Sequence, residues 1–374
     1  IPKFTNEIYV LLFFVLTGSC ILAFFDNLLM LFLGLEILSL PLYILTGIDQ
    51  RNVLGIEASL KYFLMGAFFT GILLLGIAFI YGSNGTFYLT ILTKNSNAIP
   101  SFLLAAGVIL VVISLIFKIG AAPFHFWAPD VYEGSPTVIT GFMASIVKMV
   151  AIFTLIKFLT FMRSSLGETY QLLLIFIIVA SLIVGNITAL FQQSFKRLMA
   201  YSSIGQAGYM MCILLLKGND SNETLWLYTC SYILANIGIF TVLNKVQEYS
   251  FSHFKGFAKN NPFAAFVLAV CLLSMAGIPL TAGFMAKLFL LKNLLHVGSY
   301  LWLAILIVLF SVIGLSYYLR LIQVMYFKKN DDDAQPALSL SFNTGAKIGL
   351  ICVLVAIVLL GIFPYSLFSL YYFN

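Results

Sequence analysis

The sequence predicts an all-α, polytopic membrane protein with about eleven transmembrane helices. Of the 374 residues, 61% are hydrophobic and only 9% are charged, whereas soluble domains are about half apolar and a quarter charged. Apolar runs long enough to cross a bilayer, about 20 residues each, follow one another along the whole chain. The first run continues almost directly into the second, which is typical of a membrane helix and not of a cleaved signal peptide.

The expected spans are joined by polar connections, none of which resembles a soluble domain. The two longest connections, 82–99 and 328–344, are rich in the turn and loop formers Gly, Asn, Asp and Pro. Lysine and arginine are more frequent on the side of the N-terminus, which predicts that this side faces the cytoplasm, or the matrix in a mitochondrion. The spans cover residues 8–25, 27–47, 57–81, 100–124, 136–160, 170–193, 200–217, 224–247, 262–292, 299–327 and 345–371.

Two of the spans, the fourth and the ninth, are interrupted by Gly and Pro. The fourth contains Gly120 and Pro123 in FKIGAAPFHFW, and the ninth contains Gly277 and Pro279 in SMAGIPLTAGFMAK. These residues release backbone groups from the helical hydrogen-bond ladder, and such groups are tolerated in lipid only where protein or water satisfies them. Paired broken helices in corresponding parts of a chain point to a transport site.

The interrupted spans are five helices apart, which predicts two five-helix repeats with discontinuous helices plus one C-terminal helix. Repeat one covers about 8–160, repeat two about 170–327, and the last helix about 345–371. Because each repeat has an odd number of helices, the second must be inverted in the membrane relative to the first. A chance match between two broken helices is the alternative.

Five charged residues lie inside long apolar runs: Glu36, Lys61, Lys118, Lys148 and Lys287. A charge near the middle of a bilayer costs from about 3 to more than 10 kcal/mol, so each is a candidate functional residue. Desolvation can lower the pKa of a buried lysine several units below about 10.4, so that it accepts and releases protons near neutral pH. Lys118 and Lys148 lie on neighbouring spans and require bridging waters to exchange a proton. The pattern indicates ion or proton transport.

The surroundings of these residues leave alternatives open. We expect Lys61 to pair with Glu36, because an unpaired buried carboxylate is driven to its neutral form; the alternative is that the lysine extends its amine to the headgroups. His125, with an unperturbed pKa of about 6.5, is a proton relay or a structural histidine. The polar stretch 127–136 holds two carboxylates and is a solvated loop, a proton entry or a partner contact.

Nothing in the sequence indicates a redox or hydrolytic centre, and we expect no cofactor in this chain. The five cysteines are scattered singly in apolar runs, without a Cys/His cluster for zinc or an iron–sulfur centre. No phosphate loop, dinucleotide fingerprint or haem pair is present in the sequence, so energy must come from another protein. The net charge of +6 lies mostly in the connections, and no basic run is interleaved with polar surface, which excludes a nucleic-acid partner.

Four strings carry a resemblance to a known family. They are EASLKYFLMGAFFTGILLLGIAFIYG (57–82), FKIGAAPFHFWAPDVYEGSPT (117–137), KRLMAYSSIGQAGYM (196–210) and LSMAGIPLTAGFMAK (273–287). Together they resemble the subunit N family of respiratory complex I, called subunit 2 in mitochondria, among the antiporter-like membrane subunits. Full-length members have fourteen helices, and this chain resembles the last eleven. The strings are more similar to bacterial than to animal members, which implies a multi-pass protein of the bacterial inner membrane; the mitochondrial inner membrane is the alternative.

The resemblance implies a role in a proton relay for each charged residue. The family's buried glutamate corresponds to Glu36, and its partner lysine corresponds to Lys61. The lysines of the two broken helices correspond to Lys118 and Lys287, and the lysine of the helix that follows the first break corresponds to Lys148.

The resemblance also implies a proton-translocating membrane-arm subunit of NADH:quinone oxidoreductase. Quinone reduction elsewhere in the complex drives such a subunit, with NADH, FMN and iron–sulfur clusters in partner subunits. The implied partners are other membrane and peripheral subunits of complex I, including neighbouring antiporter-like subunits, within the lipid bilayer. One alternative is a subunit of a multisubunit cation/proton antiporter or a membrane-bound hydrogenase. The other is a non-pumping structural subunit, which predicts that the buried charges pair into dry salt bridges.

Overall fold

The computed structural model describes residues 5–94, 102–166, 169–216, 219–328 and 340–365. Regular structure in these ranges is helical, apart from two isolated β-bridges, Asn27 with Tyr88 and Ser194 with Ser250. Ten helices in the described part of the chain are long and apolar enough to cross a membrane, and Pro262–Ala276 is a shorter apolar helix. The prediction of an all-α, polytopic membrane protein is confirmed.

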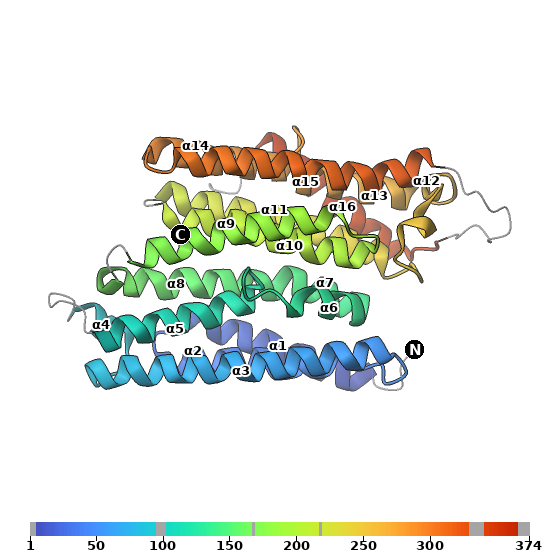
Figure 1. Cartoon of the computed structure of the whole chain (residues 1–374). Helices are drawn as coiled ribbons and strands as arrows, with labels where there is room; N and C mark the ends of the chain where they lie inside the picture. Colours follow the sequence, from blue (N-terminus) through green and yellow to red (C-terminus); the bar gives the residue numbers. More distant parts are fainter. Residues whose placement is uncertain (1–4, 95–101, 167–168, 217–218, 329–339, 366–374) are drawn as a thin grey trace. The chain divides into compact units, whose positions relative to one another are not determined.

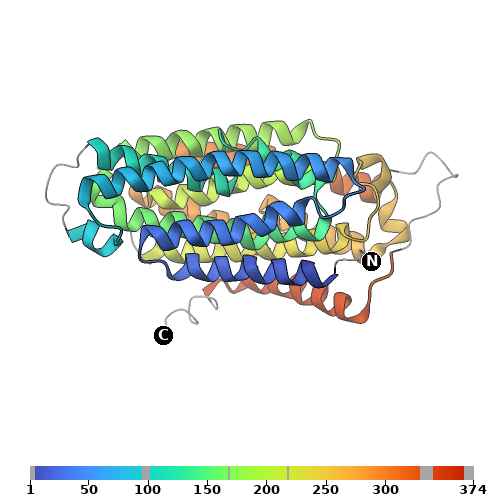
Figure 2. The same ribbon diagram turned by 90° about the horizontal axis from the view of Figure 1, so that it is seen from below.

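The chain divides into two compact units, Ile1–Ile178 and Val179–Asn374. The long helices of the first unit run side by side (Figures 1 and 2). The helices of the first unit are α1 (Thr5–Phe24), α2 (Leu28–Thr46), α3 (Val53–Asn84), α4 (Leu89–Lys94), α5 (Phe102–Ile119), α6 (Trp127–Gly134), α7 (Thr137–Phe142), the π-helix η1 (Met143–Val147), α8 (Lys148–Leu166) and α9 (Thr169–Leu190), which continues into the second unit.

The helices α3 and α5 approach each other closely at two glycines, Gly76 and Gly107. A Cβ atom built on either glycine would lie 2.8 Å from the carbonyl oxygen of the other. Small residues at a helix contact let the two backbones approach closely, which is common in membrane proteins. This contact holds α5, the helix that carries Lys118, against α3.

We expect the Gly76→Val variant to be destabilised by about 1–3 kcal/mol, because the added methyl groups overlap the backbone of α5. The matched control is Gly71→Val on the same helix, where a Cβ atom meets nothing within 4 Å. Both variants carry the same change in helix propensity, so the difference between their stabilities gives the effect of the contact between α3 and α5. Thermal unfolding of the detergent-purified complex measures it, and equal unfolding temperatures would contradict the close approach.

The second unit contains a helix whose residues are almost all buried, Phe195–Cys212. The helices of this unit are α10 (Phe195–Cys212), η2 (Ile213–Leu215), α11 (Asn219–Leu243), η3 (Phe251–Phe254), α12 (Phe257–Asn260), α13 (Pro262–Ala276), α14 (Ala282–Val297), α15 (Leu301–Phe327) and α16 (Thr344–Ile362). Here α11 packs against α13, α14 and α16, and α13 also packs against α15. These contacts surround the second predicted break.

Both predicted interruptions are present, one in each unit. The helix α5 ends at Ile119, and Gly120 follows with a left-handed φ of 74°. The helix α13 ends at Ala276, Gly277 has a φ of 87°, and α14 begins at Ala282. Glycine adopts these left-handed conformations without the steric cost that other residues incur. The ninth expected span is therefore two helices joined by a turn.

The C-terminal helix α16 lies against the turn between α13 and α14. Leu280 in this turn has a φ of 72°, which is rare for a bulky residue. A Cβ atom on Gly361 of α16 would overlap the carbonyl oxygen of Leu280. The last helix thus packs against the second break through a glycine contact.

For the stretch 127–136, the structure corrects one of the three alternatives, the solvated loop. The stretch contains α6, in which Trp127 and Tyr132 are buried. The indole N–H of Trp127 donates a hydrogen bond of 3.0 Å to the carbonyl oxygen of Phe117. This bond satisfies a backbone group released at the end of α5. The polar residues of the stretch therefore belong to a short helix that stabilises the first break.

The division into units leaves the repeat organisation a prediction. The boundary between residues 178 and 179 falls inside α9, close to the expected start of repeat two. The inverted relation of the two repeats stays an inference from the sequence. The acidic run 331–333 in the connection 328–344 lies outside the described residues.

Candidate functional site

The first candidate site surrounds Lys118, in the last turn of α5 before the break. Its side chain is buried, with 7% of the residue exposed. The amine donates hydrogen bonds to the hydroxyl of Ser39 on α2 and, at 3.4 Å, to that of Tyr62 on α3. It also lies 5.5 Å from the ring centroid of Tyr43 and 5.3 Å from that of Tyr62. Aromatic faces at these distances attract a cation without neutralising it.

Glu36 shares a small cavity with Lys118. The Thr70 hydroxyl on α3 donates a hydrogen bond of 2.8 Å to Glu36 Oε1 on α2. The residues that line the cavity include Glu36, Thr70, Ser39, Ser114 and Lys118. A volume of about 20 Å³ in it is open to the centre of a water molecule. A site needs roughly 10–15 Å³ by this measure to hold one water. The cavity therefore has room for at least one water.

The predicted ion pair between Glu36 and Lys61 is wrong. The Lys61 amine lies 2.7 Å from a carboxylate oxygen of Glu57 and 2.7 Å from one of Asp130, and 44% of its side chain is exposed. Lys61 and Thr70 are nine residues apart, two and a half turns of a helix with 3.6 residues per turn. They therefore point to opposite sides of α3, and the side that faces Glu36 carries the threonine.

Lys148 and His125 are also placed by the structure in the first unit. Lys148 is buried, with 5% of the residue exposed, and is the first residue of α8 after the π-helix. The helix α8 packs against α5, and π-helical segments frequently occur at functional sites. His125 lies in the segment between α5 and α6, where its ring stacks on Phe126 with centroids 4.6 Å apart. The relay role of each stays a prediction.

The second candidate site surrounds Lys287 on α14, in the second unit. The buried amine donates hydrogen bonds to the carbonyl oxygens of Met275, at 3.1 Å, and Ala276, at 2.9 Å. These carbonyls belong to the last turn of α13, where the chain leaves the helix at Gly277 and the carbonyls lose their helical partners. The negative end of a helix dipole favours a cation there. The ring centroid of Tyr209 lies 5.1 Å from the amine.

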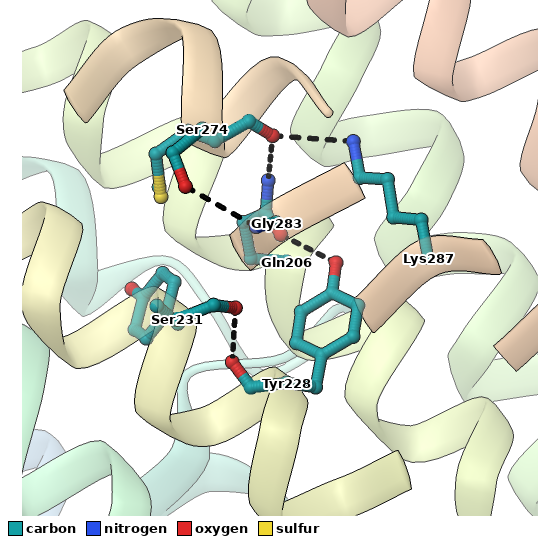
Figure 3. A pocket seen from close by; sticks show the side chains of 8 residues that line it. Gln206, Tyr228, Ser231, Ser274, Gly283 and Lys287 are labelled. Carbon is teal, nitrogen blue, oxygen red and sulfur yellow. Dashed lines mark hydrogen bonds between the residues drawn. The ribbon is translucent and has the colours of Figure 1, made fainter. Parts of the chain in front are cut away.

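Two neutral polar residues, Gln206 and Tyr228, extend the hydrogen bonds of this site beyond Lys287. The amide nitrogen of Gln206 on α10 donates to the Met275 carbonyl at 3.1 Å, and the Tyr228 hydroxyl on α11 donates to Gln206 Oε1 at 2.6 Å. Figure 3 shows the Lys287 amine and the Gln206 side chain directed at the same carbonyl oxygen. The adjoining cavity, with about 10 Å³ open to the centre of a water molecule, is lined by Gln206, Tyr228, Lys287 and Ser274 among others. It has room for about one water.

Reasoning from the sequence found the charged members of both sites and missed the neutral ones. Ser39 lies three residues after Glu36, so helical spacing places it on the same face of α2. Gln206 is an amide in the middle of an apolar span, which is a weaker form of the signal that singled out the lysines. Serine, threonine and tyrosine are frequent in membrane helices, and nothing in their spacing distinguishes Thr70 or Tyr228 from others.

Comparisons with known proteins agree on one family. Residues 26–314 match the family described as NADH:quinone oxidoreductase/Mrp antiporter, transmembrane. The NADH-quinone oxidoreductase subunit N of Cytophaga hutchinsonii is 38% identical over 95% of this chain and 77% of its own length. The protein of the same name from Flavobacterium johnsoniae is 42% identical over 86% of this chain and 71% of its own length.

Solved structures show the same fold. A chain of respiratory complex I from Thermus thermophilus is 31% identical, with a TM-score of 0.84 over 97% of this chain and 80% of its own length. A chain of an archaeal membrane-bound sulfane sulfur reductase is 26% identical, with a TM-score of 0.87 over 96% of this chain and 73% of its own. A chain of the Mrp complex from a Dietzia species, 20% identical with a TM-score of 0.85 over 96% of this chain and 75% of its own, shares the fold.

Proposed function

Because this chain belongs to the family of NADH:quinone oxidoreductase and Mrp antiporter transmembrane subunits, and within it to the subunit N group, we propose that it carries protons across the membrane. It is a multi-pass protein of the bacterial inner membrane and a member of an NADH-quinone oxidoreductase complex. Quinone reduction in partner subunits, which hold the NADH, FMN and iron–sulfur chemistry, supplies the energy. This chain contributes ionisable side chains and space for water.

The observation that carries the proposal is that the two lysines at the breaks have neutral hydrogen-bond partners. Lys118 donates to hydroxyls and Lys287 donates to carbonyls. Within the described residues, neither forms a salt bridge. A buried amine that has a carboxylate partner is held in its charged form, whereas an amine with neutral partners has no fixed counter-charge and is free to change protonation state.

This arrangement argues against a purely structural role. A non-pumping subunit was expected to pair its buried charges in dry salt bridges, and the charge pairs found at Lys61 are half-exposed. The lysines at the breaks instead adjoin cavities with room for water. In the proposal, Lys118 and Lys148 exchange protons within the first unit, Glu36 adjusts the field at Lys118, and Lys287 is the station of the second unit.

A pair of lysines on α8 tests the proposal. We expect Lys148→Met to lower quinone-coupled proton pumping at least about fivefold, since a positioned acid–base group contributes about 10² to 10⁴ to the rate of proton transfer. The control is Lys157→Met on the same helix, whose amine caps α1 through the Ala23 carbonyl at 2.9 Å. The initial rate of proton uptake by inverted membrane vesicles, divided by the amount of assembled complex, measures the effect.

The amount of assembled complex is monitored by NADH oxidation with an artificial electron acceptor. Pumping by the Lys157→Met vesicles should equal that of the unaltered complex, because this lysine supports a helix end and not the buried sites. If Lys148→Met and Lys157→Met vesicles pump alike at the unaltered rate, the proposed relay is wrong.

A further inference from the structure

Four helices of the second unit meet in one hydrogen-bond chain. Tyr228 on α11 donates to Gln206 Oε1 on α10, at 2.6 Å, and Gln206 donates its amide N–H to the Met275 carbonyl on α13, at 3.1 Å. Lys287 on α14 donates to the same carbonyl, also at 3.1 Å. Figure 3 shows these hydrogen-bonded residues. Of them, the relay proposed above uses only Lys287.

The chemistry of the groups gives this hydrogen-bond chain one direction. The Met275 carbonyl can only accept, so the Gln206 amide must turn its nitrogen toward it. The amide oxygen then faces Tyr228, and the hydroxyl must donate its single proton to that oxygen. The lone pairs of the Tyr228 oxygen remain as acceptors, and Tyr228 and Lys287 both line the adjoining cavity.

Burial makes this order obligatory. Gln206 is 4% exposed and Tyr228 is 2% exposed, so neither can replace a lost partner with bulk water. A buried polar group without a partner is costly, and the cost is larger than the gain from an average hydrogen bond. The Met275 carbonyl has two lone pairs, and Gln206 and Lys287 occupy one each.

We propose that Gln206 and Tyr228 are positioning residues for proton exchange at Lys287. Gln206 holds the Met275 carbonyl in place, so that the Lys287 amine, which binds this carbonyl, stays beside the cavity. Tyr228 presents an oxygen that accepts a hydrogen bond from a water in that cavity, which orients the water's own oxygen toward the amine. When the lysine releases its proton, the N–H bond breaks, the electron pair stays on nitrogen, and the water oxygen takes the proton and passes one on.

This inference rests on the proposed function, and three variants of the assembled complex test it in membrane vesicles: Tyr228→Phe, Gln206→Met and the double variant. Each single change removes hydrogen bonds and keeps the approximate shape. We expect each to lower the rate of proton pumping per assembled complex by about threefold to tenfold, as the loss of a buried hydrogen bond implies. The double variant should pump no more slowly than the slower of the two single variants, because both residues belong to one hydrogen-bond chain and losing either one breaks it.

A matched control and an isotope measurement separate positioning from folding. Thr229→Val removes a buried hydroxyl next to Tyr228 whose bonds, in the part of the chain that the structure describes, go to carbonyls of its own helix, and it should pump normally. The ratio of pumping rates in H₂O and D₂O should rise in Tyr228→Phe and Gln206→Met, because proton exchange at Lys287 becomes the slow step. A merely structural defect lowers the amount of active complex and leaves this ratio unchanged.

The Lys287→Met variant distinguishes a failure of the proposed function from a failure of the positioning role. If it pumps normally, the proposed function of this site fails. If it stops pumping while Tyr228→Phe and Gln206→Met pump normally with an unchanged isotope ratio, the relay stands and the positioning role is overturned. Additive losses in the double variant would likewise overturn it.

Discussion

Replacing Lys118 with methionine is expected to lower quinone-coupled proton pumping about tenfold or more. Methionine fills a similar volume and removes the only group of this side chain that binds a proton, and a positioned acid–base group contributes about 10² to 10⁴ to a proton-transfer rate. The neutral partners Ser39 and Tyr62 cannot take over, because their hydroxyls hold their protons near neutral pH. The initial rate of proton uptake by membrane vesicles, divided by the amount of assembled complex, measures the loss.

The Lys118→Arg variant separates proton exchange from a need for positive charge. Arginine keeps the charge beside Glu36 and does not release its proton at any physiological pH. We therefore expect Lys118→Arg to pump as poorly as Lys118→Met, while NADH oxidation with an artificial acceptor shows that the complex is assembled. Normal pumping by the arginine variant would mean that the site supplies a fixed field, and the assignment of a proton station to Lys118 would be wrong.

The Gly283→Ala variant should lose stability and pumping together. A Cβ atom on Gly283 would overlap the carbonyl oxygen of Ser274, in the last turn of α13, and the Gly283 N–H donates a 3.2 Å hydrogen bond to the Ser274 hydroxyl. Because the overlapped carbonyl oxygen belongs to the backbone and cannot turn away as a side chain can, α14 must move. Overpacking of this kind costs about 1–3 kcal/mol and occasionally more. Lys287 lies one turn further along α14, so the same movement displaces its amine from the carbonyls.

Thermal unfolding of the purified complex and vesicle pumping measure the two effects of Gly283→Ala. The control is Gly349→Ala on α16, where a Cβ atom meets nothing within 4 Å. In an exposed helix position this change is expected to stabilise by about 0.5–1 kcal/mol. An unfolding temperature of Gly283→Ala equal to that of Gly349→Ala would contradict the tight contact between α13 and α14.

The candidate sites were predictable from the sequence only in their charged members. Lys118, Lys148 and Lys287 stand out because a charge in an apolar run is costly in lipid wherever the helix is placed. The pairing of Lys61 was not predictable in the same way, because the expected partner depends on which side of α3 faces α2. The structure turns Lys61 toward Glu57 and Asp130, and the expected pair with Glu36 was wrong for that reason.

The short helix α6 was not predictable from its own residues alone. Its polar residues suggested a solvated loop, yet its aromatic residues are buried and Trp127 binds the carbonyl of Phe117. Polar residues indicate that one side of a segment can face solvent. Whether the other side is buried depends on a neighbour that is distant in the sequence.

By itself, the sequence determined the membrane class, the positions of both breaks and the lysines next to them. Each of these depends on the cost of one residue type in its own helix: apolar length, Gly or Pro in the ladder, or charge in lipid. Only the tertiary structure decided that Glu36 shares a cavity with Lys118 and that Gln206 and Tyr228 lead to Lys287. Those neighbours are set by how each helix is rotated in its packing, which depends on contacts spread over several helices.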